Sequence, residues 1–141
     1  MSLQEDRGEY WQKSLGPRKK EWSQEEIIKA MEANMHLHMT FFTKYLPVTR
    51  CHFEPDVKVV ISDIQDDSFN YIIGARFDKS EVDERVKHVI ELFQTAKKPF
   101  SWWVGPLDEP ASLEDSLQKQ GLSLKEDDIG MSLSLENYQV K

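Results

Sequence analysis

The histidines and the single cysteine are the side chains best suited to metal binding or nucleophilic catalysis. His36 and His38 are two positions apart in a predicted helix, so they point to different faces and cannot share a metal ion. Cys51 directly precedes His52, and a lone cysteine does not supply a structural zinc site. A cysteine nucleophile would need a base and an orienting group brought by folding. We expect a half-buried thiol at Cys51, a hydrogen-bonded core histidine at His38 and no metal site.

Two further sets of polar residues are expected to have structural roles. Asp63, Asp66 and Asp67 lack the ligand spacing of a calcium-binding loop, so a solvated turn is expected. His88 follows Glu84 by four positions on a predicted helix, which favours a surface ion pair. Neither group predicts a catalytic centre.

The doubled tryptophan, Trp102 and Trp103, is a candidate for an interface or a groove. Neighbours on a strand point to opposite faces, so one ring is expected in the core and the other on the opposite sheet face. The second ring is either covered by a helix or exposed as an anchor, a frequent role of tryptophan at interfaces. Structural packing is the preferred interpretation.

The first element that must position these residues is a helix. Ser23-Gln24-Glu25-Glu26 forms a capping box. An apolar stripe with steps of three and four then predicts a helix whose inward face is Ile27, Met31, Met35, His38, Phe42 and Leu46. Pro47 ends this helix, which is either continuous or broken near Asn34.

The remaining elements alternate between strands and helices. Strands are expected at 51–54, 57–61, 69–77, 100–104, 122–125 and 129–135. A second helix begins after a cap at Asp78 or Ser80, buries Val82, Val86, Val89, Ile90 and Phe93, and carries surface pairs Glu81–Arg85 and Asp83–Lys87. A third helix begins at Ser112 and ends before Gly121. The predicted fold class is α/β (an α+β mixed sheet), mostly antiparallel, with one parallel pair inside residues 69–104.

Length and charge narrow the class of protein. The 141 residues suit one domain, expected at 23–141 after a flexible arm at 1–22. The net charge of -7 opposes nucleic-acid binding, and residues 108–128 form an acidic stretch expected to be a solvated edge. No apolar run approaches the ~18 residues of a membrane span, and no secretory signal is recognised. We expect a cytoplasmic protein.

One segment resembles a known family. Residues 99–106 read Pro-Phe-Ser-Trp-Trp-Val-Gly-Pro, followed at matching spacings by Pro110, Leu113, Leu117, Gly121, Gly130, Met131 and Leu135. Over residues 23–138 the pattern resembles the N-terminal domain of bacterial two-domain GNAT-family N-acetyltransferases. The resemblance implies a degenerate GNAT-like (acyl-CoA N-acyltransferase-like) fold that supports or positions substrate without catalysis. A second GNAT domain, expected just after Lys141, or another copy of the chain would be its partner, with a small amine as substrate.

The resemblance also provides a test for cofactor binding. GNAT enzymes hold the acetyl-CoA pyrophosphate on backbone amides of a Q/R-x-x-G-x-G/A loop at a helix N-terminus. Arg76 fits the first position, but Lys79 and Glu81 replace both glycines. Asp78 and Asp83 add negative charge where the anion would lie. No cofactor is therefore expected for this chain.

Alternatives remain open at this point. A divergent loop could bind acetyl-CoA through Arg76, Asp78, Lys79 and Ser80, which would make the chain a stand-alone N-acetyltransferase. The chain could also be a self-associating adaptor domain without acyl chemistry. No residue is identified as catalytic.

Overall fold

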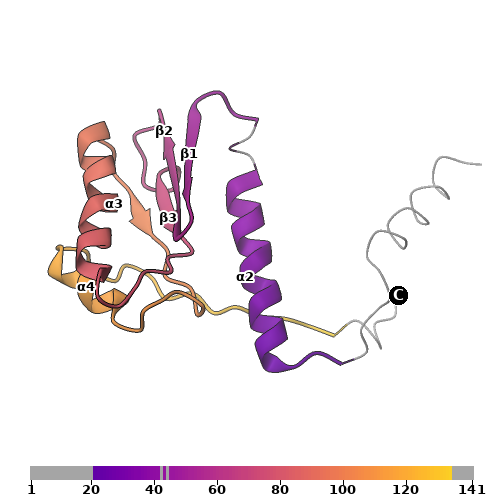
Figure 1. The fold of residues 1–141 in the computed structure, drawn as a ribbon. Helices are drawn as coiled ribbons and strands as arrows, with labels where there is room; N and C mark the ends of the chain where they lie inside the picture. The colour runs from indigo at the N-terminus through magenta and orange to yellow at the C-terminus, as the bar shows by residue number, and fades with distance from the viewer. Residues whose placement is uncertain (1–20, 42, 44, 135–141) are drawn as a thin grey trace, which may run out of the picture.

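The computed structural model describes residues 21–41, 43 and 45–134 (Figure 1). The predicted arm at 1–22 lies almost wholly outside these residues, as do Phe42 and Leu135. The elements, in chain order, are α2 (Gln24–Phe41), β1 (Thr49–Glu54), β2 (Val57–Ser62), β3 (Tyr71–Ile73), α3 (Val82–Ala96), β4 (Ser101–Trp102) and α4 (Leu113–Lys119). None of the described helices is long and apolar enough to cross a membrane.

The strands form one mixed sheet in the order β1-β2-β3-β4. β1 and β2 pair antiparallel, as do β2 and β3, whereas β3 and β4 are parallel across the α3 connection. α2 lies on one side of the sheet, and α3 and α4 lie on the other (Figure 1). The predicted α+β class, the mostly antiparallel sheet and the single parallel pair are therefore confirmed.

The main core lies between the sheet and α3. All five predicted apolar positions of α3 are buried, and they pack against buried Val57, Val59 and Ile72 of the sheet and against α4. The ring of Phe93 is fully buried and stacks on Phe100, with ring centroids 4.7 Å apart. Such burial of β-branched and aromatic side chains is the main stabilising term of a small domain.

The capping box of α2 is confirmed, but the predicted inward face is only partly correct, since Ile27, Met31 and Met35 are half-buried and Leu46 is exposed. The Ser23 amide donates to Glu26 Oε2 at 2.9 Å, and the Glu26 amide donates to Ser23 Oγ at 3.2 Å. Glu32 is the buried residue of the helix, and His38, expected in the core, is exposed. The stripe missed Glu32 because it followed mainly apolar side chains, whereas this helix packs partly through a buried carboxylate.

The caps of the later helices also differ from expectation. Asp78 Oδ1 accepts from the Ser80 amide at 2.8 Å in a local turn, and the cap position of α3 is Glu81, which makes no side-chain cap bond. Ser112 occupies the cap position of α4, again without a side-chain bond. Gly121 has a φ of +88°, the left-handed conformation predicted after that helix.

The predicted strands after α4 are wrong for the part of the chain that is described. Residues 122–134 contain no strand, and the side chains of Leu124, Ile129, Met131 and Leu133 are exposed. Alternating apolar residues form a strand only where a sheet edge offers hydrogen-bonding partners. This segment does not pair with β4, which is two residues long.

Replacing Phe93 by alanine tests the assignment of the core. We expect Phe93→Ala to lower the free energy of unfolding by about 3–5 kcal/mol because it leaves a cavity among fully buried side chains. Urea denaturation measures the change. Phe53→Ala is the matched control, since that ring is 54% exposed and its loss should cost no more than about 1 kcal/mol. Equal losses for both variants would contradict the assignment.

Candidate functional site

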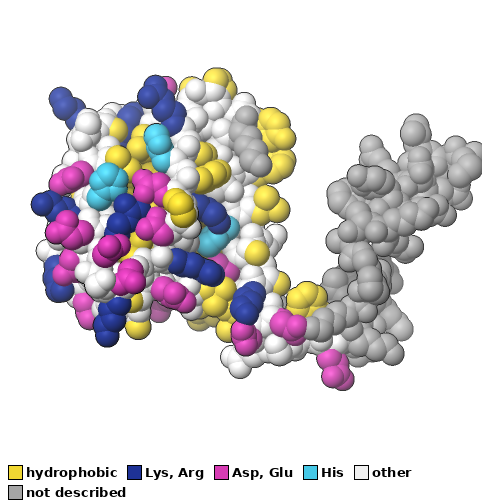
Figure 2. Space-filling view, in the orientation of Figure 1, with side chains coloured by type: hydrophobic (Ala, Val, Ile, Leu, Met, Phe, Trp, Pro, Cys, Tyr) yellow, Lys and Arg dark blue, Asp and Glu magenta, His cyan; other side chains and the backbone are white. Residues whose placement is uncertain are grey.

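A cavity of about 260 Å³ lies where α2 meets β2 and the chain that follows β3. It is lined by Glu32, His36, Glu54, Pro55, Val57, Lys58, Gly74, Arg76 and Asp108. Figure 2 shows acidic, basic and histidine side chains crowded together beside α2, whereas hydrophobic side chains gather over the C-terminal end of that helix. The cavity therefore combines charges of both signs and is the candidate site.

The cavity depends on the early separation of β3 and β4. The two strands pair only at Tyr71↔Ser101 and Ile72↔Trp102. The chain then leaves the sheet and returns at Glu109, whose amide donates to the Ala75 carbonyl at 2.9 Å. Residues 103–108, here called the excursion loop, extend between these points. Gly105 in this loop lies so close to α2 that a Cβ there would be 1.9 Å from Glu32 Oε1.

Two carboxyl groups, one on α2 and one in the excursion loop, lie close together. Glu32 Oε1 and Asp108 Oδ1 both lie within 4 Å of the position that a Cβ on Gly105 would occupy. Glu32 is 6% exposed, and within the described residues neither Glu32 Oε1 nor Asp108 Oδ2 has a hydrogen-bond partner. Buried acceptors without donors are rare in folded proteins and point to a missing proton or ligand.

Burial also changes the acidity of this pair. Loss of water raises the pKa of Glu32, although the Leu107 amide opposes the change. Burial raises the pKa of Asp108 from 3.8 to about 6, and the negative charge of Glu32 adds to the effect. The Gly105 amide and Arg76 act in the opposite direction on Asp108. The pair therefore retains a proton up to a pH of about 6.

Basic groups form the other wall of the cavity. Lys58 Nζ lies 3.2 Å from His36 Nδ1, and burial, assisted by the charges of Lys58 and Arg76, lowers the pKa of His36. A neutral His36 can then accept a hydrogen bond from Lys58. Its ring packs against Gly74, which has a φ of +65° and where a Cβ would be 2.8 Å from His36 Cε1. The Arg76 side chain lines the cavity and makes no hydrogen bond or ion pair with any described residue.

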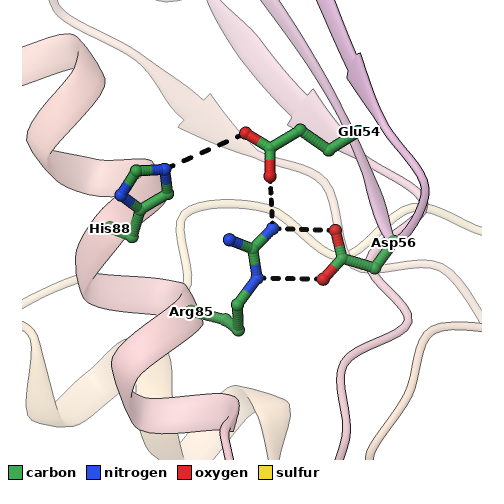
Figure 3. Close-up of polar contacts among 4 residues, drawn as sticks. All are labelled: Glu54, Asp56, Arg85 and His88. Atoms are coloured by element: carbon green, nitrogen blue, oxygen red, sulfur yellow. Dashed lines mark hydrogen bonds and ion pairs between the residues drawn. The ribbon is translucent and has the colours of Figure 1, made fainter.

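A second polar cluster holds the β1–β2 hairpin against α3 (Figure 3). Arg85 donates from Nε to Asp56 Oδ2 at 2.9 Å and from Nη2 to Asp56 Oδ1 at 2.7 Å. Arg85 Nη2 also donates to Glu54 Oε2 at 2.5 Å, and His88 Nε2 lies 3.9 Å from Glu54 Oε1. Glu54 is thus already paired, although it lines the cavity.

This cluster corrects the ion pairs predicted along α3. Arg85 pairs with the hairpin and not with Glu81, and the carboxylate near His88 belongs to Glu54 and not to Glu84. Asp83 pairs with Lys119 of α4 at 3.2 Å, not with Lys87. Helical spacing reports only neighbours within one helix, so it misses partners that tertiary packing brings closer and holds more firmly.

The residues named for a divergent acetyl-CoA loop are divided by the fold. Arg76 lines the cavity, whereas Asp78, Lys79 and Ser80 lie in an exposed turn. The amide and hydroxyl of Ser80 both donate to Asp78 Oδ1, at 2.8 and 2.5 Å, and these bonds lower the pKa of Asp78. The Glu81 amide donates to the Asp78 carbonyl at 3.0 Å. Two amides of this turn are therefore already occupied, and a carboxylate lies beside them.

The two tryptophans differ as the strand geometry predicts. Trp102 packs against the main core and meets Phe77 edge to face, with ring centroids 6.2 Å apart. Trp103 is 39% exposed, and its Nε1 donates to Ser101 Oγ at 3.2 Å. The role of the exposed ring as an anchor stays a prediction.

Several site residues were missed from the sequence. Glu32 and His36 are four positions apart on a helix, a spacing that could have marked a shared face. Asp108 was assigned to a solvated acidic edge, yet it is half-buried in the cavity. Lys58 carried no signal, because it is one polar residue in an apolar strand. The folding of the chain alone brings these residues together.

The other polar candidates behave as expected. Asp66 Oδ1 accepts from the Ser68 amide at 2.8 Å in an exposed turn, and Cys51 is half-buried. Across the described ranges no three His, Cys, Asp or Glu side chains are grouped so that they could hold a metal ion. In comparisons with known proteins, the chain matches no protein-family model, no curated protein and no solved structure.

The raised pKa of Asp108 predicts a loss of stability with rising pH. The folded protein binds this proton more tightly than the unfolded chain, so stability falls as pH increases from about 4 through 6. Asp108→Asn should therefore be more stable than the unmodified protein at pH 7.5, by on the order of 1–3 kcal/mol, and no different at pH 3.5. Urea midpoints from pH 3.5 to 8 measure this difference.

Asp66→Asn provides a control of opposite sign. Hydrogen bonds with Ser68 lower the pKa of Asp66. Its contribution to stability is therefore present at neutral pH and is lost as the pH falls below 3.8, the ordinary pKa of the group. A difference for Asp108→Asn that favoured the unmodified protein at pH 7.5 would contradict the buried carboxyl pair.

Removing the Arg85 guanidinium tests the hairpin cluster. Arg85→Gln should lower the free energy of unfolding by about 1–3 kcal/mol, because two part-buried carboxylates lose charge-assisted hydrogen bonds. Thermal and urea denaturation report the loss. Lys87→Gln, an exposed change on the same helix, should stay within about 0.5 kcal/mol. If Lys87→Gln proved the costlier change, the assigned partners would be wrong.

Proposed function

We propose that this chain is a non-catalytic GNAT-like domain that holds a small amine substrate for an acetyl-CoA-dependent N-acetyltransferase domain. Its partner in this proposal is a second GNAT domain, or another copy of the chain, that supplies the cofactor. The partly exposed Trp103 beside the short edge strand β4 is the proposed contact.

The order of elements supports the relationship. Three antiparallel strands are followed by α3 and then by a parallel strand, as the resemblance implies, although the final strands of that order are absent from residues 122–134. Gly105, part of the Trp-Trp-Val-Gly-Pro segment, lies where a Cβ would displace the carboxyl end of Glu32. The segment that carries the resemblance therefore also forms the cavity wall.

The turn before α3 supports a domain without its own cofactor. A pyrophosphate needs free backbone amides and a favourable charge at a helix N-terminus. Here Asp78 already accepts from Ser80, and the first turn of α3 adds Asp83 and Glu84. The expected interaction with a multiply charged anion is repulsive, so the stand-alone acetyltransferase is the weaker hypothesis.

The observation that carries the proposal is a pair of cavity carboxyl groups, each with one buried oxygen that accepts no hydrogen bond from any described residue. An ammonium group has three donors and a positive charge, so it can satisfy Glu32 and Asp108 together. Charge-assisted hydrogen bonds of this kind are among the strongest in proteins. The same arrangement gives little support to a purely structural adaptor, which has no use for buried acceptors left unsatisfied.

Titration with acetyl-CoA and with small primary amines tests the proposal. We expect acetyl-CoA at millimolar concentration to give no heat in calorimetry and no thermal shift, whereas an amine that binds the folded state raises the melting temperature. Saturable acetyl-CoA binding would replace the proposal with a stand-alone enzyme. An absence of binding for both ligand classes, with concentration-dependent sedimentation, would replace it with an adaptor domain.

A further inference from the structure

We infer that the cavity binds a small zwitterion that carries an ammonium and a carboxylate, the chemical class of the free amino acids. The ammonium would lie at Glu32 and Asp108, and the carboxylate would lie at Arg76. This inference rests on the proposed function, because it names the substrate class of the same site.

The acceptor side of the cavity is specific for a cationic donor. Glu32 is more than nine-tenths buried and Oε1 accepts no hydrogen bond, and Asp108 Oδ2 is also without a donor in the described part of the chain. Glu54, the third carboxylate of the lining, is already bound by Arg85 and offers little further capacity. A single ammonium can donate to both unsatisfied oxygens at once.

The donor side of the cavity requires an anion as well. Lys58 is engaged with His36, whereas the Arg76 guanidinium makes no hydrogen bond or ion pair with a described residue and acts on Glu32 and Asp108 only through its charge. A guanidinium presents a planar fork of donors that matches a carboxylate in two parallel hydrogen bonds. A simple amine would leave Arg76 unpaired and close to a second cation, so a ligand with both charges fits the cavity better than either charge alone.

The volume of the cavity limits the ligand to a small molecule. About 260 Å³ lies just below the range of about 300–1,000 Å³ that is usual for small-molecule sites. Nucleotide-sized cofactors are too large for it. The cavity is lined by both acidic and basic groups, which favours a compact ligand with one ammonium and one carboxylate.

The test begins with a panel of zwitterions. Thermal-shift scans of the intact chain at pH 8, where Asp108 is ionised, would use the proteinogenic α-amino acids, β-alanine and 4-aminobutanoate. Calorimetry then compares the strongest binder with its decarboxylated amine and its N-acetyl derivative. We expect each derivative to bind at least about tenfold more weakly, because each lacks one charge-assisted contact.

Variants assign the two ends of the ligand. Glu32→Gln and Arg76→Gln should each weaken the zwitterion at least about tenfold. Arg76→Gln should not weaken binding of the decarboxylated amine, because it removes a positive charge near Glu32 and Asp108. Arg50→Gln, an exposed change on β1 outside the cavity, is the matched control and should have no effect. If Glu32→Gln fails to fold, Asp108→Asn tests the same end of the ligand.

The outcomes separate this inference from the proposed function. Failure of every panel member to bind overturns the inference. A decarboxylated amine that binds as tightly as its parent, with no effect of Arg76→Gln, also overturns it but leaves the amine-holding function intact. Zwitterion binding that depends on Glu32 and Arg76, accompanied by saturable acetyl-CoA binding, supports the inference and overturns the non-catalytic assignment.

Discussion

The short pairing between β3 and β4 is the constraint on which the rest of the site depends. Two residue pairs hold the strands together before the excursion loop leaves the sheet, and the chain rejoins only at Glu109. The gap is filled from α2, whose Glu32 reaches Gly105 in the loop. A Cβ at Gly105 would lie 1.9 Å from Glu32 Oε1, so the glycine leaves room for the end of this side chain. The cavity follows from this close approach.

The two sides of the sheet contribute differently to the stability of the fold. On the α3 side, buried aliphatic and aromatic residues form a continuous core, reinforced by Arg85 across the hairpin. On the α2 side, a smaller apolar cluster lies beside carboxyl groups whose burial disfavours their charged forms. Proteins retain such unfavourable burial where it serves a function, and the stability comes from elsewhere in the fold. The stable α3 side can therefore carry a cavity that costs stability.

The charged groups are arranged differently in the turn before α3 and in the cavity beside α2. The turn before α3 uses its amides internally and carries acidic side chains, an arrangement unfavourable for a phosphate. Within the part of the chain that the structure describes, the cavity beside α2 offers carboxyl oxygens without hydrogen bonds and a guanidinium without an ion-pair contact. Recognition of a small charged molecule is therefore better supported at the cavity than cofactor binding is at the turn.

The amino-acid sequence by itself determined the elements whose signals are local. The capping box at Ser23, the apolar face of α3 and the antiparallel strands 51–62 follow from neighbouring residues, and each is present. Only the tertiary structure decided that Glu32 faces inward while His38 faces solvent, that Arg85 binds the hairpin, and that residues 122–134 form no strand. These features depend on residues far away in the chain. The cost of a buried charge and the pairing of a strand edge are set by the groups that folding places beside them.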